Sequence, residues 1–161
     1  MKKWTKTIKI NAPIEQVWQY FNGSLKNMQK IMPQVVGHQP IKETEAGVGS
    51  IYRQQYQEGK RIEEYDVETI EYKNEEQEKE LKVQFTLANL FDITTHYELE
   101  KTDSETTTFT YTTINNPLKW YVKPFLLFTN DKVVMKFLER VKHVAESEFT
   151  EGGRNRWLRE K

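Results

Sequence analysis

The side chains of this chain that are best suited to chemistry are tyrosines, threonines and a glutamine, most of which recur at every second position. Alternate residues of a β-strand share one face, so these side chains are expected to line the same side of a sheet. They are Tyr52, Gln54, Tyr56, Tyr65, Thr95, Tyr97, Tyr111 and Thr113. Buried tyrosine hydroxyls need hydrogen-bond partners. The set therefore predicts either a polar network within the core or a group that hydrogen-bonds a carbonyl or hydroxyl of a ligand.

Motifs for catalysis and for metal binding are lacking in this sequence. Its three histidines, His38, His96 and His143, show no metal-ligand spacing, and each is interpreted as a surface histidine. There is no HExxH motif, glycine-rich phosphate loop or nucleophile elbow. None of the four serines has an evident base nearby in the sequence. We therefore predict no catalytic residue, no metal site and no cofactor, and an enzyme is the less favoured interpretation.

Composition excludes several classes of partner and chemistry. The 161 residues suffice for one domain, and the 24 basic and 24 acidic residues give a net charge of zero, which argues against a nucleic-acid partner. The lack of cysteine excludes disulfides and thiolate chemistry. The N-terminal MKKWTKTIKI has no apolar centre of a signal peptide, and no apolar run approaches the roughly 20 residues of a membrane span. We therefore expect a cytoplasmic protein without stable membrane insertion.

The elements that must position the polar side chains are organised around one long helix at residues 131–149. Its apolar residues recur with the helical period and form one stripe: Val133, Val134, Phe137, Leu138, Val141, Val144, Ala145 and Phe149. The pair Gly152-Gly153 is expected to end this helix. That leaves residues 150–161 as a basic, flexible tail outside a single domain at 1–149.

Most of the chain before this helix is predicted to be β-strand. The expected strands cover residues 2–10, 35–44, 49–58, 60–72, 78–88, 90–101 and 105–114. Their connections are short, so consecutive strands should pair antiparallel. Two short helices are expected after the first strand, one following Pro13 and one capped by Ser24 and stopped by Pro33. A bulge before Ile70 is expected to switch the faces of its strand.

The order of these elements predicts an α+β fold in which a seven-stranded, curved antiparallel sheet wraps around the long helix. A curved sheet and a straight helix diverge at one end, so a cavity between them is a geometric consequence. We expect the first two turns of the helix, Val133 to Leu138, to roof this cavity. The later part, Val141 to Phe149, should pack against the sheet and the first strand.

Three stretches resemble the START-related, polyketide cyclase-like superfamily of lipid-transfer proteins and cyclases, known as SRPBCC, which has the helix-grip fold. In IKINAPIEQVWQYF the matching residues are Ile8, Ile10, Ala12, Pro13, Glu15, Val17 and Trp18. GVGSIY at 47–52 resembles the glycine-led start of the third strand, and FLERVK at 137–142 resembles the C-terminal helix. The resemblance spans roughly residues 3–149 and implies an internal cavity for a lipid, polyketide, quinone or similar apolar molecule. It implies no single activity, because the superfamily includes carriers, cyclases, hydroxylase ligand domains and chaperone activators.

The predicted ligand-binding residues combine the inward strand positions with the start of the long helix. They are Tyr52, Gln54, Tyr56, Tyr65, Phe85, Phe91, Thr95, Tyr97, Tyr111, Trp120, Phe125, Val134, Phe137 and Leu138. Trp120 and Phe125 belong to the apolar segment 115–128. This segment either packs on the sheet as a lead-in to the helix, in which Asn116-Pro117 begins a helical turn, or forms a lid over the cavity.

Three functional hypotheses follow from the sequence. The favoured one is a protein that binds or carries a small hydrophobic ligand without catalysis. The second is a cyclase- or dehydratase-like enzyme that uses tyrosine hydroxyls of the cavity, although the inward residues include no clear acid or base. The third is a chaperone-activator-like interaction module, which would have a filled core and an exposed apolar patch near residues 120–128.

Overall fold

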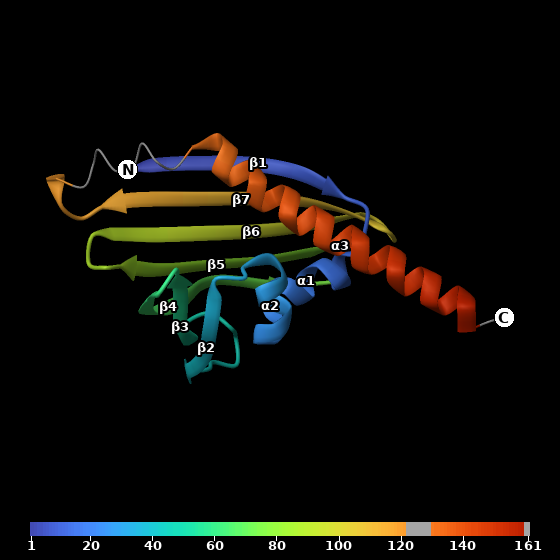
Figure 1. Cartoon of the computed structure of the whole chain (residues 1–161), viewed down its shortest axis with the longest axis horizontal. Coiled ribbons are helices and arrows are strands. Elements are labelled where there is room, and N and C mark those ends of the chain that lie inside the picture. Colours follow the sequence, from blue (N-terminus) through green and yellow to red (C-terminus); the bar gives the residue numbers. More distant parts are fainter. Residues whose placement is uncertain (122–129, 160–161) are drawn as a thin grey trace.

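The computed structural model describes residues 1–121 and 130–159, with side chains to residue 152. In these residues seven antiparallel strands form one sheet in the order β1-β7-β6-β5-β4-β3-β2. The strands are β1 (Lys2–Ile10), β2 (Val35–Lys42), β3 (Ile51–Glu58), β4 (Arg61–Asn74), β5 (Glu78–Leu87), β6 (Phe91–Asp103) and β7 (Thr106–Pro117). The helices are α1 (Ile14–Asn22), α2 (Leu25–Ile31) and α3 (Asp131–Arg159). The predicted α+β helix-grip fold is therefore confirmed, with α3 crossing the face of the sheet (Figure 1).

Short turns fix the register of the sheet. The β5–β6 turn contains Ala88 and Asn89, both with positive φ, as a tight hairpin turn requires. Between β4 and β5 the register shifts between Thr69 and Glu71, which is the bulge predicted before Ile70. The bulge keeps Tyr72 on the same side of the sheet as Thr69, because one extra residue resets the alternation.

The two short helices close one end of the sheet. Ser24 caps α2 by accepting a hydrogen bond from the backbone N–H of Asn27, as its type predicts. Against β5, α1 is held by Lys79, whose side chain is only 3% exposed and whose Nζ lies 2.9 Å from Glu15 Oε1. The same ammonium group lies 6.0 Å from the centre of the Trp18 ring. A buried charge needs such partners, so this contact fixes α1 over the sheet.

The filled part of the core lies between β1, β6 and β7, the helix α1 and the middle of α3. Its fully or nearly fully buried residues include Ile10, Ala12, Val17, Leu99, Phe109, Leu138, Val141 and Ala145. Thr107 is also fully buried, and its hydroxyl donates a hydrogen bond to the Ala12 carbonyl oxygen. The interior is therefore packed at this end of the sheet, which leaves any open space at the other end.

Two boundaries differ from the expectations. Helix α3 continues through Gly152 and Gly153 to Arg159, so the prediction that these glycines end it is wrong. Glycine costs about 1 kcal/mol in a helix relative to alanine but does not break it when its φ stays negative, and Gly152 is not among the positive-φ glycines. Asn116 and Pro117 end strand β7 rather than begin a helical turn.

Segment 115–128 is described only to residue 121, so the expectation of a lid or a lead-in lies largely outside the described residues. The separate tail predicted at 150–161 stays a prediction. In the described part of the chain, no helix combines the length and apolar character needed to cross a membrane.

Candidate functional site

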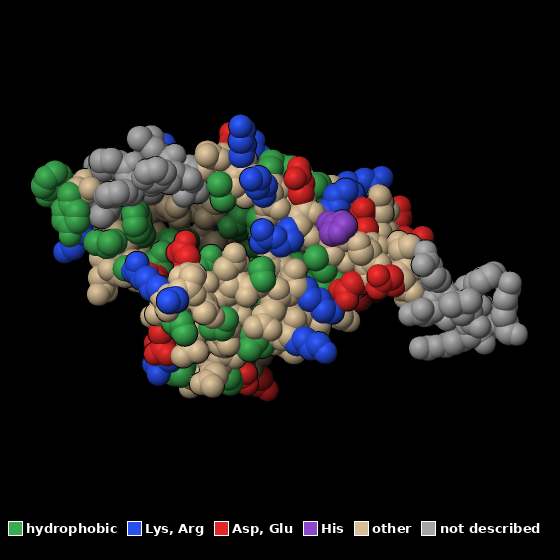
Figure 2. All heavy atoms as spheres, viewed as in Figure 1, with side chains coloured by type: hydrophobic (Ala, Val, Ile, Leu, Met, Phe, Trp, Pro, Cys, Tyr) green, Lys and Arg blue, Asp and Glu red, His purple; other side chains and the backbone are tan. Residues whose placement is uncertain are grey.

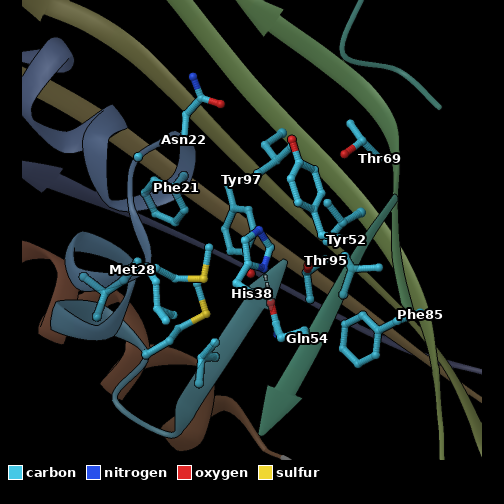
Figure 3. Close-up of a pocket in the computed structure, with 18 of the residues that line it drawn as sticks. Phe21, Asn22, Met28, His38, Tyr52, Gln54, Thr69, Phe85, Thr95 and Tyr97 are labelled. Atoms are coloured by element: carbon cyan, nitrogen blue, oxygen red, sulfur yellow. Dashed lines mark hydrogen bonds between the residues drawn. The ribbon is translucent and has the colours of Figure 1, made fainter. Parts of the chain in front are cut away.

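A cavity of about 960 Å³ lies between the concave face of the sheet, the helices α1 and α2, and the first part of α3. Figure 2 shows the surface hollowed beside α3. The cavity forms because α3 packs tightly on β1 and diverges from the strands at the far edge of the sheet. Its wall takes side chains from all the strands except β1, so residues far apart in the sequence face one space (Figure 3).

Ten of the residues predicted to bind a ligand lie on the wall of this cavity. They are Tyr52, Gln54, Tyr56, Tyr65, Phe85, Thr95, Tyr97, Tyr111, Val134 and Phe137. Strand alternation places the eight strand residues there, on the concave face of the sheet, and the helical period of α3 places Val134 and Phe137. Whether they contact a ligand stays a prediction.

Three predicted residues do not line the cavity, and a fourth lies outside the described residues. Leu138 is fully buried in the filled core, because its position on α3 faces β1 and β7. Phe91 begins β6 opposite Pro117 of β7, at the end of the strand beyond the cavity wall. Trp120 is 82% exposed. Phe125 belongs to the residues that the structure does not describe.

Helix α3 is divided between the cavity and the core. Its cavity-lining residues run from Val133 to Arg140, whereas Val141 and Ala145 are fully buried in the core. The expected division of the helix is confirmed except at Leu138, which belongs to the core, and the cavity part extends to Arg140, slightly beyond the two turns predicted.

Sequence reasoning missed several cavity residues, of which His38 is the most important chemically. The others include Phe21, Met28, Ile31, Met32, Ser50, Thr69, Leu81 and Val83. The interpretation of His38 as a surface histidine is wrong, because it is part-buried on the cavity wall. The register shift between Val35 and Gly37 in the β2–β3 pairing interrupts the alternation just before His38. Its direct pairing with Gln54, an inward residue, is visible only in the structure, so sequence alternation offered no signal for it.

His38 begins a chain of hydrogen bonds that crosses three strands. Its Nδ1 lies 3.0 Å from Gln54 Oε1, and Gln54 Nε2 donates to the Tyr65 hydroxyl at 3.0 Å. Aromatic stacking holds both ends, since the His38 ring lies 4.7 Å from Tyr52 and the Tyr65 ring lies 4.7 Å from Phe85. Figure 3 shows His38 and Gln54 joined by this hydrogen bond. The cavity therefore has an ordered polar strip on an apolar wall.

Burial keeps the polar groups of the wall uncharged. It raises the pKa of Tyr65, Tyr97 and Tyr111 above the usual value, so each phenol stays protonated at neutral pH. Burial also lowers the pKa of His38, and the hydrogen bond with Gln54 offsets this only in part. The charged residues of the wall, Glu43, Glu45, Lys136 and Arg140, are all exposed. The interior thus suits a neutral, largely apolar molecule, with charge confined to the rim.

A second cluster of titratable groups lies outside the cavity, on the opposite face of the sheet. Possible ligand atoms of Glu71, Glu80 and His96 lie within 4.8 Å of one another. Lys82 lies 3.4 Å from Glu71, so the cluster already contains a cation. Sequence spacing did not indicate this cluster, because its residues come from three neighbouring strands.

Comparison with known proteins gives a family match and several structural neighbours. Residues 1–146 match the family described as polyketide cyclase / dehydrase and lipid transport. No curated protein matches the sequence of the chain.

Among solved structures, a START superfamily protein from Mycobacterium smegmatis is 12% identical with a TM-score of 0.66, covering 92% of this chain and 97% of that one. The Zhui aromatase/cyclase from Streptomyces sp. R1128 has the same identity and TM-score, covering 92% of this chain and 93% of that one. Norcoclaurine synthase from Thalictrum flavum, in complex with dopamine and hydroxybenzaldehyde, is 16% identical with a TM-score of 0.60, covering 89% of this chain and 85% of that one. At these identities the likeness extends to the fold alone.

Proposed function

Because the chain belongs to the polyketide cyclase / dehydrase and lipid transport family, we propose that it binds a small hydrophobic molecule in the cavity between its sheet and α3. The observation that carries this proposal is the cavity itself, with a volume of about 960 Å³ and a wall of apolar and uncharged polar side chains. Cavities of roughly 300–1,000 Å³ suit small organic ligands. The norcoclaurine synthase complex supports the proposal, since that neighbour holds aromatic compounds.

Native mass spectrometry and thermal unfolding together test the proposal. A molecule that co-purifies with the protein should appear as a constant added mass in native spectra. A hydrophobic compound present at 100 times its dissociation constant should raise the stability by about 2.7 kcal/mol. For a domain of this size that corresponds to a melting-point increase of roughly 5–10 °C.

A matched pair of variants locates the binding. Val83 faces the cavity, so Val83→Trp should fill part of it and weaken the melting-point increase. Val48 is 46% exposed and does not line the cavity, so Val48→Trp should leave the increase unchanged. Equal responses of the two variants, or no response of the unmodified protein to any hydrophobic compound, would contradict the proposal.

An enzyme that acts on a carbonyl compound in the cavity is the second candidate function. His38 favours it, because burial lowers the pKa of the imidazole and keeps it in the neutral form that can accept a proton. A direct test is the exchange of the α-hydrogens of 2-tetralone for deuterium, followed by NMR in D₂O. Catalysis predicts faster exchange with the protein and no acceleration with His38→Phe. An exchange rate equal to that in buffer argues against it.

The interaction-module hypothesis receives less support. It needs a filled core, whereas the wall described here encloses a large cavity. Leu118, Trp120 and Tyr121 are exposed at 43%, 82% and 52%, so an apolar surface does exist at the end of β7. If this surface were the functional site, hydrophobic compounds would leave the melting point unchanged in the thermal-unfolding measurement.

A further inference from the structure

The polar strip His38–Gln54–Tyr65 has a direction, and that direction determines which ligand groups it can bind. Gln54 Oε1 can only accept a hydrogen bond, so His38 Nδ1 must carry the hydrogen in the contact between them. A neutral imidazole then has a lone pair on Nε2. Burial lowers the pKa of His38 and favours this neutral form. The histidine end of the strip is therefore an acceptor.

The tyrosine end has the opposite character. Gln54 Nε2 donates to the Tyr65 hydroxyl oxygen, which leaves the hydroxyl hydrogen of Tyr65 available for donation. Within residues 1–121 and 130–152, neither this hydrogen nor His38 Nε2 has a hydrogen-bond partner. Both residues line the cavity, so these groups are available to a bound molecule.

Thr95 supplies a second sign that the cavity is built for a polar group on a ligand. Its side chain is 7% exposed and lines the cavity. Its hydroxyl oxygen makes no hydrogen bond of normal geometry in the part of the chain that the structure describes, although it lies near enough to the Tyr97 hydroxyl to oppose the rise in the pKa of that phenol. A buried hydroxyl without a partner destabilises the folded protein, and a ligand that hydrogen-bonds to it removes that cost.

Rigidity adds specificity to the strip. The ring of His38 is stacked on Tyr52 and that of Tyr65 on Phe85, with interplanar angles of 10° and 18°. Gln54 ties the two rings together, so neither can turn without breaking a hydrogen bond. Groups held in this way lose little conformational entropy on binding.

We infer that the ligand is a neutral apolar molecule that carries both a hydrogen-bond donor and an acceptor, as a phenol or a hydroxyketone does. Its donor hydroxyl binds His38 Nε2, and its acceptor oxygen binds the Tyr65 hydroxyl. The remainder of the molecule packs against the apolar part of the cavity wall near Met28 and Phe85. This inference rests on the proposed binding function and specifies the ligand class.

Three probes of nearly equal size separate the contributions of the strip. 2-Methylnaphthalene has neither group, 2-methoxynaphthalene offers an acceptor only, and 2-naphthol offers both a donor and an acceptor. Isothermal titration should give an affinity that rises in this order, by about threefold to tenfold per hydrogen bond gained.

Two variants assign each increase in affinity between the probes to one residue of the strip. Tyr65→Phe should make 2-methoxynaphthalene bind no better than 2-methylnaphthalene, while 2-naphthol keeps an advantage through His38. His38→Phe keeps a ring against Tyr52 and should make 2-naphthol bind no better than 2-methoxynaphthalene. Tyr121→Phe and His143→Phe make the same changes at exposed positions and should preserve the full order. If either cavity variant unfolds, Gln54→Leu replaces it. This change removes the hydrogen bonds to both His38 and Tyr65, so both increases in affinity between the probes should become smaller.

The outcomes distinguish this inference from the proposed function. Equal affinities of the three probes for the unmodified protein would overturn the inference and leave hydrophobic binding in place. The same order of affinities in the cavity variants would also overturn it, since the preference would then arise elsewhere. Failure of every probe to bind or to shift the melting point would remove both the inference and the proposed function.

Discussion

At the level of single residues, one contact joins all three described helices. The buried Tyr20 of α1 donates a hydrogen bond to Glu148 of α3, and Lys30 of α2 lies 2.8 Å from the other carboxylate oxygen of Glu148. Burial raises the pKa of Tyr20, so its phenol stays a donor across the physiological range. The contact holds α1 and α2 against the part of α3 that lies beyond the cavity.

Removing the two partners should have unequal effects on stability. Glu148→Ala leaves the Tyr20 hydroxyl buried without an acceptor and should lower the free energy of unfolding by about 1–3 kcal/mol. Tyr20→Phe removes the hydroxyl itself and should cost about 1 kcal/mol, because Glu148 keeps Lys30. Urea unfolding at pH 7 measures both, with Glu139→Ala on the exposed side of α3 as the control. A Tyr20→Phe loss larger than the Glu148→Ala loss would contradict this account.

The same carboxylate should make stability depend on pH. Burial alone would raise the pKa of Glu148, but the hydrogen bonds from Lys30 and Tyr20 outweigh it and lower the pKa. A carboxylate whose folded pKa is depressed contributes stability above its unfolded pKa of about 4.3, and that contribution disappears as the pH falls through the folded pKa. The stability difference between the unmodified protein and Glu148→Gln should therefore shrink below about pH 4. Urea unfolding at pH 7 and at pH 3.5 checks this, and a constant difference would refute it.

At the level of elements, strand alternation predicted most of the cavity wall. Tyr52, Gln54 and Tyr65 lie where the period of two places them, because β3 and β4 pair without a shift. Alternation does not place His38, because β2 shifts its register against β3 between Val35 and Gly37, and a shift of one residue reverses the face of every later side chain. The apolar stripe of α3 does not separate Leu138 from Phe137, because it shows which residues are apolar but not which side of the stripe borders the cavity.

Helix α3 offers a test of its unexpected length. The Cβ of an alanine at Gly152 would meet no atom within 4 Å, so Gly152→Ala should extend or strengthen the helix by about 1 kcal/mol locally. The far-ultraviolet circular dichroism of the variant should show more helix, not less. Gly59 provides the matched control, because its φ of +63° is unfavourable for alanine and Gly59→Ala should destabilise the β3–β4 turn. A loss of helical signal in Gly152→Ala would mean that the helix ends at this glycine.

At the level of the whole molecule, the sheet is divided into a packed half and a hollow half. The packed half lies over β1 and β7, where Leu138, Val141 and Ala145 of α3 are all fully buried. At the other edge, β2 is hydrogen-bonded to a strand on one side only and carries two register shifts. The hollow half should therefore open locally at a lower free energy than the packed half.

This division predicts where a ligand acts. Filling the cavity with 2-naphthol should slow amide hydrogen exchange in α2, in β2 and in the first three turns of α3, because these elements form its wall. At short labelling times, when local opening dominates, exchange in β1 and β7 should change little. The Val83→Trp variant controls for binding elsewhere and should lose the ligand-dependent protection. Equal protection of both halves at short times would mean that the molecule responds as one unit, and the ligand would then be stabilising the packed core rather than closing the hollow half over itself.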